Sequence, residues 1–305
     1  MILARLARLA HARMGSEQVI LVDSIVVRRM RSSVAALALV CLSTSVMARA
    51  APRIVIPLES YLSTQTAVRL SVAGHEGLFL FDTGEGVSTI TPHFAAAIGC
   101  DPWGQVTGYR MSGERLDFPR CDNVRFDAQE QRFPAPIAGV FDIMSLLPKD
   151  VPVLQGAVGL DIFAGRVITI EPRANRLIIE TARSLAMRIR TAKEIRARLV
   201  RDAEGVALAV DGGVETRRGL AWMELDTGNG GALVIANHVA PLLGLKADQK
   251  DKVPLSFMLS GGISVSGDAR SRDLIMDGNI SNQFLRQWNL TLDLMNGRAW
   301  LAPAT

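Results

Sequence analysis

Two stretches of the chain share one alternation of apolar and polar residues. Residues 68–84 read VRLSVAGHEGLFLFDTG, and residues 206–228 read VALAVDGGVETRRGLAWMELDTG. In each, an alternating segment is followed by turn residues that include glycine and then by a second apolar segment. Alternation with a period of two is typical of a half-buried strand, and turn residues between two such runs indicate a hairpin. Each stretch therefore predicts a β-hairpin whose second strand leads into Asp-Thr-Gly.

The similarity continues beyond both Asp-Thr-Gly motifs. Residues 88–99 read STITPHFAAAIG, and residues 232–244 read ALVIANHVAPLLG. Each predicts an apolar strand and then a short helix, with Thr91 or Asn237 as the N-cap and a glycine after the last turn. The repeated order of elements indicates a tandem duplication.

A third pair of blocks closes the two copies. Residues 156–179 and 278–301 align at constant spacing, so that Thr169 matches Thr291. Each block predicts a short helix, a strand, a turn and a last strand. Because period-two strands dominate and the helices are short, we expect an all-β fold in which each copy closes into a small β-barrel lobe.

The repeats define the domain organisation. We expect an N-terminal extension with a signal peptide in residues 1–50, a first lobe in 51–180, a linker in 181–195 and a second lobe in 196–305. Each lobe has the size of a small domain.

The positive charge of the chain lies in its N-terminal part. The formal charge is +4, but residues 1–50 hold seven Arg against two acidic residues, which leaves 27 basic and 28 acidic residues in 51–305. No basic stripe interleaved with aromatic residues remains, so we expect no nucleic-acid partner.

Residues 28–50 have the order of a secretory signal. They read RRMRSSVAALALVCLSTSVMARA, with a basic start, an apolar run too short to span a bilayer, and Ala48-Arg49-Ala50 as a cleavage site. The alternative is a buried helix of the fold. We expect an exported protein, periplasmic or secreted, whose mature chain begins near Ala51 and which has no stable membrane insertion.

Two cysteines remain after the leader, Cys100 and Cys121. In an oxidising compartment an even number of thiols is compatible with one disulfide, and the alternative is two small buried apolar side chains. Cysteines and histidines at such scattered spacing predict no metal site, and we expect no cofactor.

The Asp-Thr-Gly motif carries the chemistry. A chance occurrence is expected only ~0.05 times in a chain of this length, yet this chain has two in matching contexts, Asp82–Gly84 and Asp226–Gly228. Together with the duplication, the motifs resemble those of the retropepsin-like aspartic proteases of bacteria, over nearly the whole mature chain. The resemblance implies two tandem pepsin/retropepsin-like lobes with the active-site cleft between them, Asp82 and Asp226 as the catalytic pair, and peptide or protein substrates.

Each motif position has a physical reason. Two carboxylates held close together share one proton, so one activates a water and the other donates to the substrate carbonyl. We expect Thr83 and Thr227 to bond across the lobe interface and Gly84 and Gly228 to let backbone N–H groups approach the carboxylates. Since one chain carries both motifs, we expect a monomer.

Two hairpins are candidate lids over the cleft. Residues 105–118 turn at Met111–Gly113 and offer Tyr109 as a substrate contact, and residues 255–269 turn at Gly261-Gly262. We interpret them as two flaps, the alternative being two ordinary surface hairpins.

Three residues depart from the family pattern: Glu85 and Asn229 directly after the motifs, and Ser281 where the first copy has Gly159. Glu85 either raises the pKa of the aspartate pair or faces solvent.

Two other functions remain as alternatives, a catalytically weak peptide-binding or scaffold protein on the same fold and a carboxylate-pair glycosidase. The identical motifs argue against the glycosidase, which needs two unlike carboxylates.

Overall fold

The computed structural model describes residues 53–304, and the leader and its cleavage site lie outside them. Of the described residues 51% are in strands and 13% in helices, so the chain is mostly β, as the alternating pattern predicted. Within this part of the chain, no helix is long and apolar enough to cross a membrane.

In the first half of the described residues the strands are β1 (Ile54–Tyr61), β2 (Gln65–Val72), β3 (His75–Phe81), β4 (Thr89–Ile90), β5 (Trp103–Tyr109), β6 (Arg115–Ala128), β7 (Gln131–Val140), β8 (Gly156–Val158), β9 (Val167–Glu171) and β10 (Arg176–Ile179). The helical segments between them are α1 (Pro92–Ala97) and the 3-10 turns η1 (Ile143–Leu146), η2 (Asp161–Phe163) and η3 (Pro172–Ala174).

In the second half the strands are β11 (Lys193–Val200), β12 (Ala209–Thr216), β13 (Gly219–Asp226), β14 (Leu233–Ala236), β15 (Val253–Leu259), β16 (Ile263–Arg272), β17 (Gly278–Ser281), β18 (Trp288–Asp293) and β19 (Arg298–Pro303). The helical segments are α2 (Ala182–Arg188), α3 (Asn282–Leu285) and the 3-10 turns η4 (Ala203–Gly205) and η5 (Ala240–Leu243).

Six strands of the first half pair into a closed ring. The order is β2-β3-β8-β4-β7-β6, and β6 returns to β2. Closure leaves no open edge in the ring and buries the residues that point inward. Phe79 and Phe126 meet edge to face inside it, with ring centroids 5.4 Å apart.

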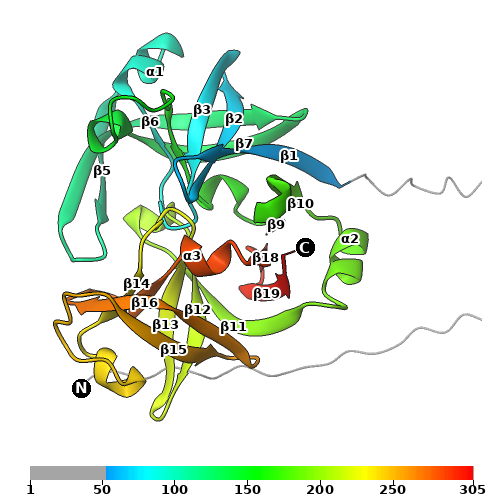
Figure 1. Cartoon of the computed structure of the whole chain (residues 1–305). Coiled ribbons are helices and arrows are strands. Elements are labelled where there is room, and N and C mark those ends of the chain that lie inside the picture. Colours follow the sequence, from blue (N-terminus) through cyan, green and yellow to red (C-terminus); the bar gives the residue numbers. More distant parts are fainter. Residues whose placement is uncertain (1–52, 305) are drawn as a thin grey trace, which may run out of the picture. The chain divides into compact units, whose positions relative to one another are not determined.

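A second ring repeats this order in the second half. Its strands run β12-β13-β17-β14-β16-β15, and β15 returns to β12. In both rings the strand that leads into Asp-Thr-Gly lies parallel to the strand of the closing block. Figure 1 shows the two sets of strands, cyan to green and yellow to orange, gathered into separate lobes.

An antiparallel sheet joins the two halves. Its strands run β1-β10-β9-β18-β19-β11, three from each half. The junction is the pair β9–β18, where Thr169 lies opposite Thr291 and their hydroxyls hydrogen-bond at 2.9 Å. The two residues matched by the repeat are therefore direct neighbours at the centre of the molecule.

The two predicted helices after the motifs differ in the structure. The side chain of Thr91 caps α1 by accepting from the Phe94 N–H at 3.2 Å, as expected. The prediction of Asn237 as a cap is wrong, because the second segment is only the 3-10 turn η5, which begins at Ala240. Asn237 instead donates to Asp248 at 2.6 Å.

The segment expected as a linker, residues 181–195, begins as α2 and includes the first residues of β11. Arg188 of α2 pairs with Glu171 at 2.8 Å and with Glu180 at 2.5 Å, so this segment packs on the central sheet.

Cys100 and Cys121 form a disulfide bond across 21 residues of sequence. Cys100 follows α1, and Cys121 is buried in β6. Of the two interpretations open from the sequence, the structure has the bonded pair.

Candidate active site

Both Asp-Thr-Gly motifs lie at the end of a strand inside their ring. Asp82 follows β3, and its N–H donates to the Val158 carbonyl at 3.0 Å. Asp226 is the last residue of β13 and pairs with Ser281. The apolar residues that precede each motif are buried in the core, so each Asp-Thr-Gly loop starts from a fixed strand.

Thr83 and Thr227 join the two loops. The Thr83 N–H donates to the Thr227 hydroxyl, and the Thr227 N–H donates to the Thr83 hydroxyl, each at 3.0 Å. The hydroxyls in turn donate to strand carbonyls of the opposite half, those of Leu225 and Phe81. The expected bonds across the interface are present, and both threonines are buried.

The two carboxylates meet at one backbone group. The Gly228 N–H donates to Asp226 Oδ1 at 2.7 Å and to Asp82 Oδ1 at 3.1 Å. Gly84 N–H donates to Asp82 Oδ1 at 2.8 Å, and Asn229 N–H donates to Asp226 Oδ1 at 2.9 Å. The structure therefore brings the two sequence-predicted aspartates into a single site.

The motif glycines are required by this close approach. A Cβ at position 228 would lie 2.0 Å from Asp82 Oδ2, and a Cβ at position 84 would lie 2.7 Å from Asp226 Cγ. Neither distance is possible for a real side chain, so each glycine leaves room for the carboxylate of the other half.

The site favours one proton on Asp82. Burial raises the pKa of Asp82 well above its ordinary value, and the charges of Asp226 and Glu85 raise it further. A side-chain hydrogen bond between the two aspartates acts in the same direction. These causes all favour the protonated form of Asp82.

Glu85 belongs to the site and does not simply face solvent. It is partly buried, and Thr89 Oγ1 donates to its Oε1 at 3.0 Å. Burial is the main cause that raises the pKa of Glu85 to about 7, with smaller contributions from Asp161 and Asp226. Of the two interpretations open from the sequence, the structure supports the one in which Glu85 raises the pKa of Asp82.

Different residues support the two Asp-Thr-Gly loops. In the first half the buried Asp161 accepts from the Ser88 N–H at 2.9 Å and from the Ser88 hydroxyl at 2.6 Å. In the second half Asn229 Nδ2 donates to Asn279 Oδ1 at 2.8 Å, and Asn282 N–H donates to the Asn229 carbonyl at 2.9 Å. Ser281, the departure noted from the sequence, is buried with a hydroxyl that has no partner.

Sequence reasoning missed Asn279 and Glu224. The fully buried Asn279 donates through Nδ2 to Asp226 Oδ2 at 2.6 Å and to Glu224 Oε2 at 3.0 Å. A usable signal existed in the sequence, because Glu224 interrupts an apolar strand at the position where the first copy has Leu80.

A cleft of about 410 Å³ opens beside the aspartates. Its first-half wall is largely apolar and includes Val106, Phe118 and Phe141, and its second-half wall carries charged residues. The cleft is lined by Gly84, Glu85, Gly86, Val87, Thr89, Val106, Gly108, Tyr109, Arg110, Leu116, Phe118, Gly139, Phe141, Leu146, Arg198, Val200, Asp202, Ala203, Ala207, Ala209, Asp211, Glu224, Ile275 and Met276.

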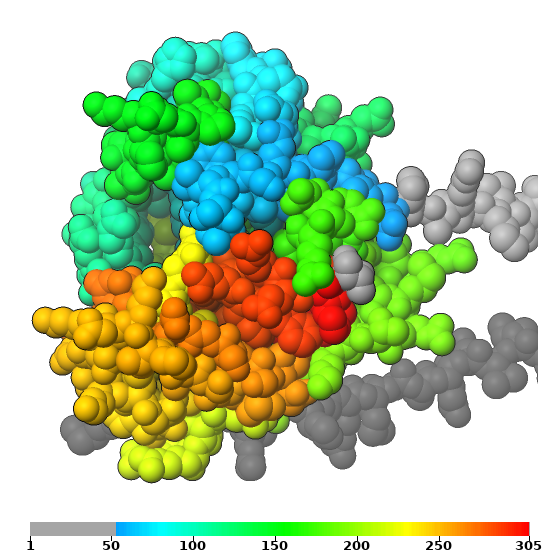
Figure 2. All heavy atoms as spheres, viewed as in Figure 1, coloured from blue at the N-terminus to red at the C-terminus, as the bar shows by residue number. Residues whose placement is uncertain are grey.

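One hairpin covers this cleft. The flap, which is the β5–β6 hairpin with its turn at 110–114, contributes Tyr109 to the lining. At its tip the Met111 carbonyl accepts from the Ile275 N–H at 3.0 Å, which joins the flap to the second half. In Figure 2 the teal flap meets orange atoms of the second half, with a hollow beside it.

The expectation of a second flap is wrong. The β15–β16 hairpin forms, but its turn packs on β11 and β12: Arg196 N–H donates to Ser260 Oγ, and Ser260 N–H donates to the Gly213 carbonyl, each at 2.8 Å. This hairpin is the counterpart of β6–β7, since β16 lies parallel to β14 as β7 does to β4. The described residues of the second half therefore contain no equivalent of strand β5.

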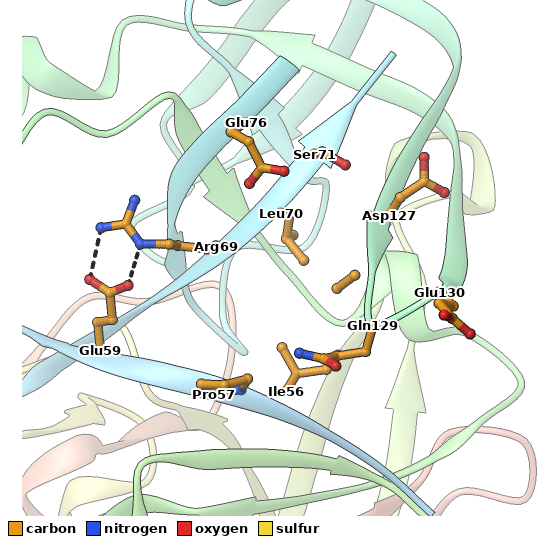
Figure 3. Close-up of a pocket in the computed structure, with 11 residues that line it drawn as sticks. Ile56, Pro57, Glu59, Arg69, Leu70, Ser71, Glu76, Asp127, Gln129 and Glu130 are labelled. Atoms are coloured by element: carbon orange, nitrogen blue, oxygen red, sulfur yellow. Dashed lines mark hydrogen bonds and ion pairs between the residues drawn. The ribbon is translucent and has the colours of Figure 1, made fainter. Parts of the chain in front are cut away.

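Another hollow, of about 400 Å³, lies away from the aspartates between β1, β2 and the β6–β7 turn. Figure 3 shows that Glu59 and Arg69 pair at its edge, while Glu76, Asp127 and Glu130 stand apart from one another. No residue next to the aspartate pair lines this hollow, whereas Gly84, Glu85 and Glu224 line the cleft, so the cleft is the candidate site.

No family model and no curated protein matches the sequence. Among solved structures, the chain is similar to the crystal structure of basic 7S globulin from soybean. The TM-score is 0.51 at 9% sequence identity, and the match covers 82% of this chain and 94% of that chain. At this identity the similarity concerns the fold alone.

Proposed function

We propose that the chain is an aspartic endopeptidase built from two pepsin/retropepsin-like lobes. The observation that carries the proposal is that Asp82 and Asp226, one from each half, accept from the same Gly228 N–H. The reciprocal Thr83–Thr227 bonds support it, because they fix the two carboxylates relative to each other.

The proposed mechanism uses the unequal protonation of the pair. Asp226, ionised, accepts a proton from a water that attacks the peptide carbonyl carbon. Asp82, protonated, donates its proton to the carbonyl oxygen, which gives a neutral tetrahedral diol. As the C–N bond breaks, the amine nitrogen takes a proton from Asp226 and the diol returns one to Asp82, so the pair regains its starting state.

The cleft suits an extended peptide as substrate. Its apolar wall, with Val106, Phe118 and Phe141, offers a pocket for a large apolar side chain beside the scissile bond. The flap excludes water from above, and Tyr109 is placed to contact the chain bound beneath it. The proposed chemistry uses the two aspartate side chains and one water molecule.

The arrangement of the carboxylates argues against the glycosidase alternative. Glycosidase carboxyl groups stand ~5–9.5 Å apart, with the sugar between them. Here Asp82 Oδ1 and Asp226 Oδ1 accept from the same Gly228 N–H, at 3.1 Å and 2.7 Å, which leaves no room for a sugar between the two carboxyl groups.

We also propose that the protein is exported, to the periplasm or beyond. The disulfide between Cys100 and Cys121 is compatible with an oxidising compartment. N-terminal sequencing of the protein recovered from outside the cytoplasm tests this, and we expect a mature chain that begins near Ala51.

Cleavage of a peptide library tests the proposed activity. We expect the wild type to cut at sites with large apolar residues, and Asp82→Asn and Asp226→Asn each to abolish cleavage, because the pair acts as one unit. Asp248→Asn, at an exposed site that bonds Asn237, is the matched control. Peptide binding without cleavage by the wild type would favour the scaffold alternative, and full turnover by Asp226→Asn would exclude the mechanism.

A further inference from the structure

The two halves differ at one pair of positions directly behind the aspartates. In the first half Leu80 lies opposite Ala157, on the parallel strands β3 and β8. At the equivalent place in the second half Glu224 lies opposite Asn279, on β13 and β17. The apolar pair of the first copy is thus replaced by a polar pair in the second. Leu80 and Glu224 each stand two residues before the aspartate of their own copy.

The amide of Asn279 is held at both ends. Its Nδ2 donates to Asp226 Oδ2 at 2.6 Å and to Glu224 Oε2 at 3.0 Å, while its Oδ1 accepts from Asn229 Nδ2 at 2.8 Å. Since the Asn229 side chain donates, the orientation of the Asn279 amide is fixed by its partners. Its side chain is fully buried, and water does not compete for these bonds.

Glu224 lies among other carboxylates. Asp211 is its cross-strand partner on β12 and is itself paired with Arg198 of β11 at 2.8 Å. Burial raises the pKa of Glu224 well above its ordinary value, followed by the charges of Asp226 and Asp211. Burial therefore favours the neutral form of Glu224, which accepts the Asn279 bond without adding charge beside Asp226.

The two catalytic aspartates consequently have unequal surroundings. Asp226 accepts from three donors, the N–H groups of Gly228 and Asn229 and the amide of Asn279. Asp82 accepts from two donors, the N–H groups of Gly84 and Gly228, and faces Glu85. Hydrogen bonds donated to a carboxylate favour its charged form, so Asn279 acts on one member of the pair only.

We propose that Asn279 and Glu224 are positioning residues that make Asp226 the ionised member of the resting pair and leave the resting proton on Asp82. Asn279 donates to Asp226, and Glu224 anchors the amide so that it cannot turn away. This inference rests on the proposed function for its catalytic meaning, but the protonation states that it specifies are measurable without any substrate.

The test is a carboxyl titration of the mature protein with ¹³C-labelled Asp and Glu, the Asp226 signal being assigned by its loss in Asp226→Asn. Asn279→Ala recreates the Ala157 environment of the first half and removes one bond to a charged group. We expect it to raise the pH at which Asp226 titrates by about one unit. Asn237→Ala, which also loses an Asn–carboxylate bond but at the surface, is the control and leaves the Asp226 titration in place.

Two Glu224 variants separate anchoring from simple packing. Glu224→Leu recreates Leu80 and removes the acceptor, so the Asp226 titration should move in the same direction as in Asn279→Ala. Glu224→Gln keeps an acceptor oxygen and should move it clearly less than Glu224→Leu. If Gln and Leu behave alike, or if Asn279→Ala leaves the titration unchanged, the inference is wrong. Should Asn279→Ala fail to fold, the two Glu224 variants still decide it.

The pH dependence of peptide cleavage adds the catalytic readout. In Asn279→Ala the acid limb of kcat/KM should move upward together with the Asp226 titration, with kcat reduced about tenfold and KM little changed. A shifted titration in a protein that cleaves no peptide would support the positioning role and reject the proposed function. An unshifted titration in an active protease would reject the positioning role alone.

Discussion

The Thr83 hydroxyl donates to the Leu225 carbonyl at 2.5 Å, whereas the equivalent Thr227 hydroxyl lies 3.5 Å from the Phe81 carbonyl. The two threonines otherwise exchange identical bonds with each other. The connection between the halves is thus reciprocal in pattern and unequal in strength.

This inequality predicts unequal costs of substitution. Thr83→Val removes a buried hydroxyl that makes a short bond, and we expect a loss of about 1–3 kcal/mol in the free energy of unfolding. Thr227→Val should cost less, and Thr83→Ser should keep most of the stability. Denaturant unfolding measures all three, and a larger loss in Thr227→Val than in Thr83→Val would contradict the geometry.

Stability should fall as the pH rises from acid to neutral. The pKa of Glu85 is raised to about 7 and that of Asp161 to about 6, mainly by burial. The folded protein therefore holds these protons at pH values where the unfolded chain has lost them. The stabilisation is complete below the ordinary pKa values and is lost as the pH passes through about 6 to 7.

Glu85→Gln tests this relation, because glutamine does not titrate. We expect a flatter dependence of the urea midpoint on pH between 4 and 8. The same substitution removes a charge that raises the pKa of Asp82, so the alkaline limb of cleavage should move to lower pH. An unchanged alkaline limb would show that Glu85 does not act on Asp82.

The disulfide should matter for stability more than for chemistry. It closes a loop of 21 residues at the base of the flap, and such a loop contributes ~3 kcal/mol. We expect Cys100→Ser/Cys121→Ser to unfold at lower denaturant concentration while keeping the Asp82–Asp226 titration. Thiol counting before and after reduction gives the control, and two free thiols in the native exported protein would refute the bond.

A single chain should form the complete active site. Asp82 and Asp226 both come from it, and the contacts between them are intramolecular. Specific activity should stay constant on dilution, with the mass of a monomer in light scattering. Activity that declines together with a dimer would show that the tandem copies are not the catalytic pair.

The mostly β fold and the pairing of the two aspartates could be predicted from the sequence because the duplication repeats the pattern of each element. Alternation predicted the β3 and β13 strands, and the match of Thr169 with Thr291 placed both residues correctly at equivalent positions. The Thr83–Thr227 contact followed from the motif, since its geometry is set by the short loop itself.

The features that were missed depend on tertiary context. Gly261-Gly262 is a good turn sequence, but where a hairpin points is decided by the strands around it, here β11 and β12. The Asn237 cap failed because the helical segment is a single 3-10 turn that begins only at Ala240, while Asn237 bonds Asp248. Glu224 and Asn279 lie far apart in sequence and meet only because β13 and β17 are parallel neighbours.

The bond between the Met111 carbonyl and the Ile275 N–H, which holds the flap to the second half, affects which substrates can enter the cleft. A cleft closed over by its flap binds substrate only in the fraction of molecules whose flap is open, and the apparent affinity falls by that fraction. A folded protein surface cannot pass beneath a closed hairpin, whereas an unfolded segment slides in during a brief opening. The proposed protease would thus select substrates first by whether they are unfolded and only then by their side chains. Damaged or unfolded chains would be cut ahead of native ones.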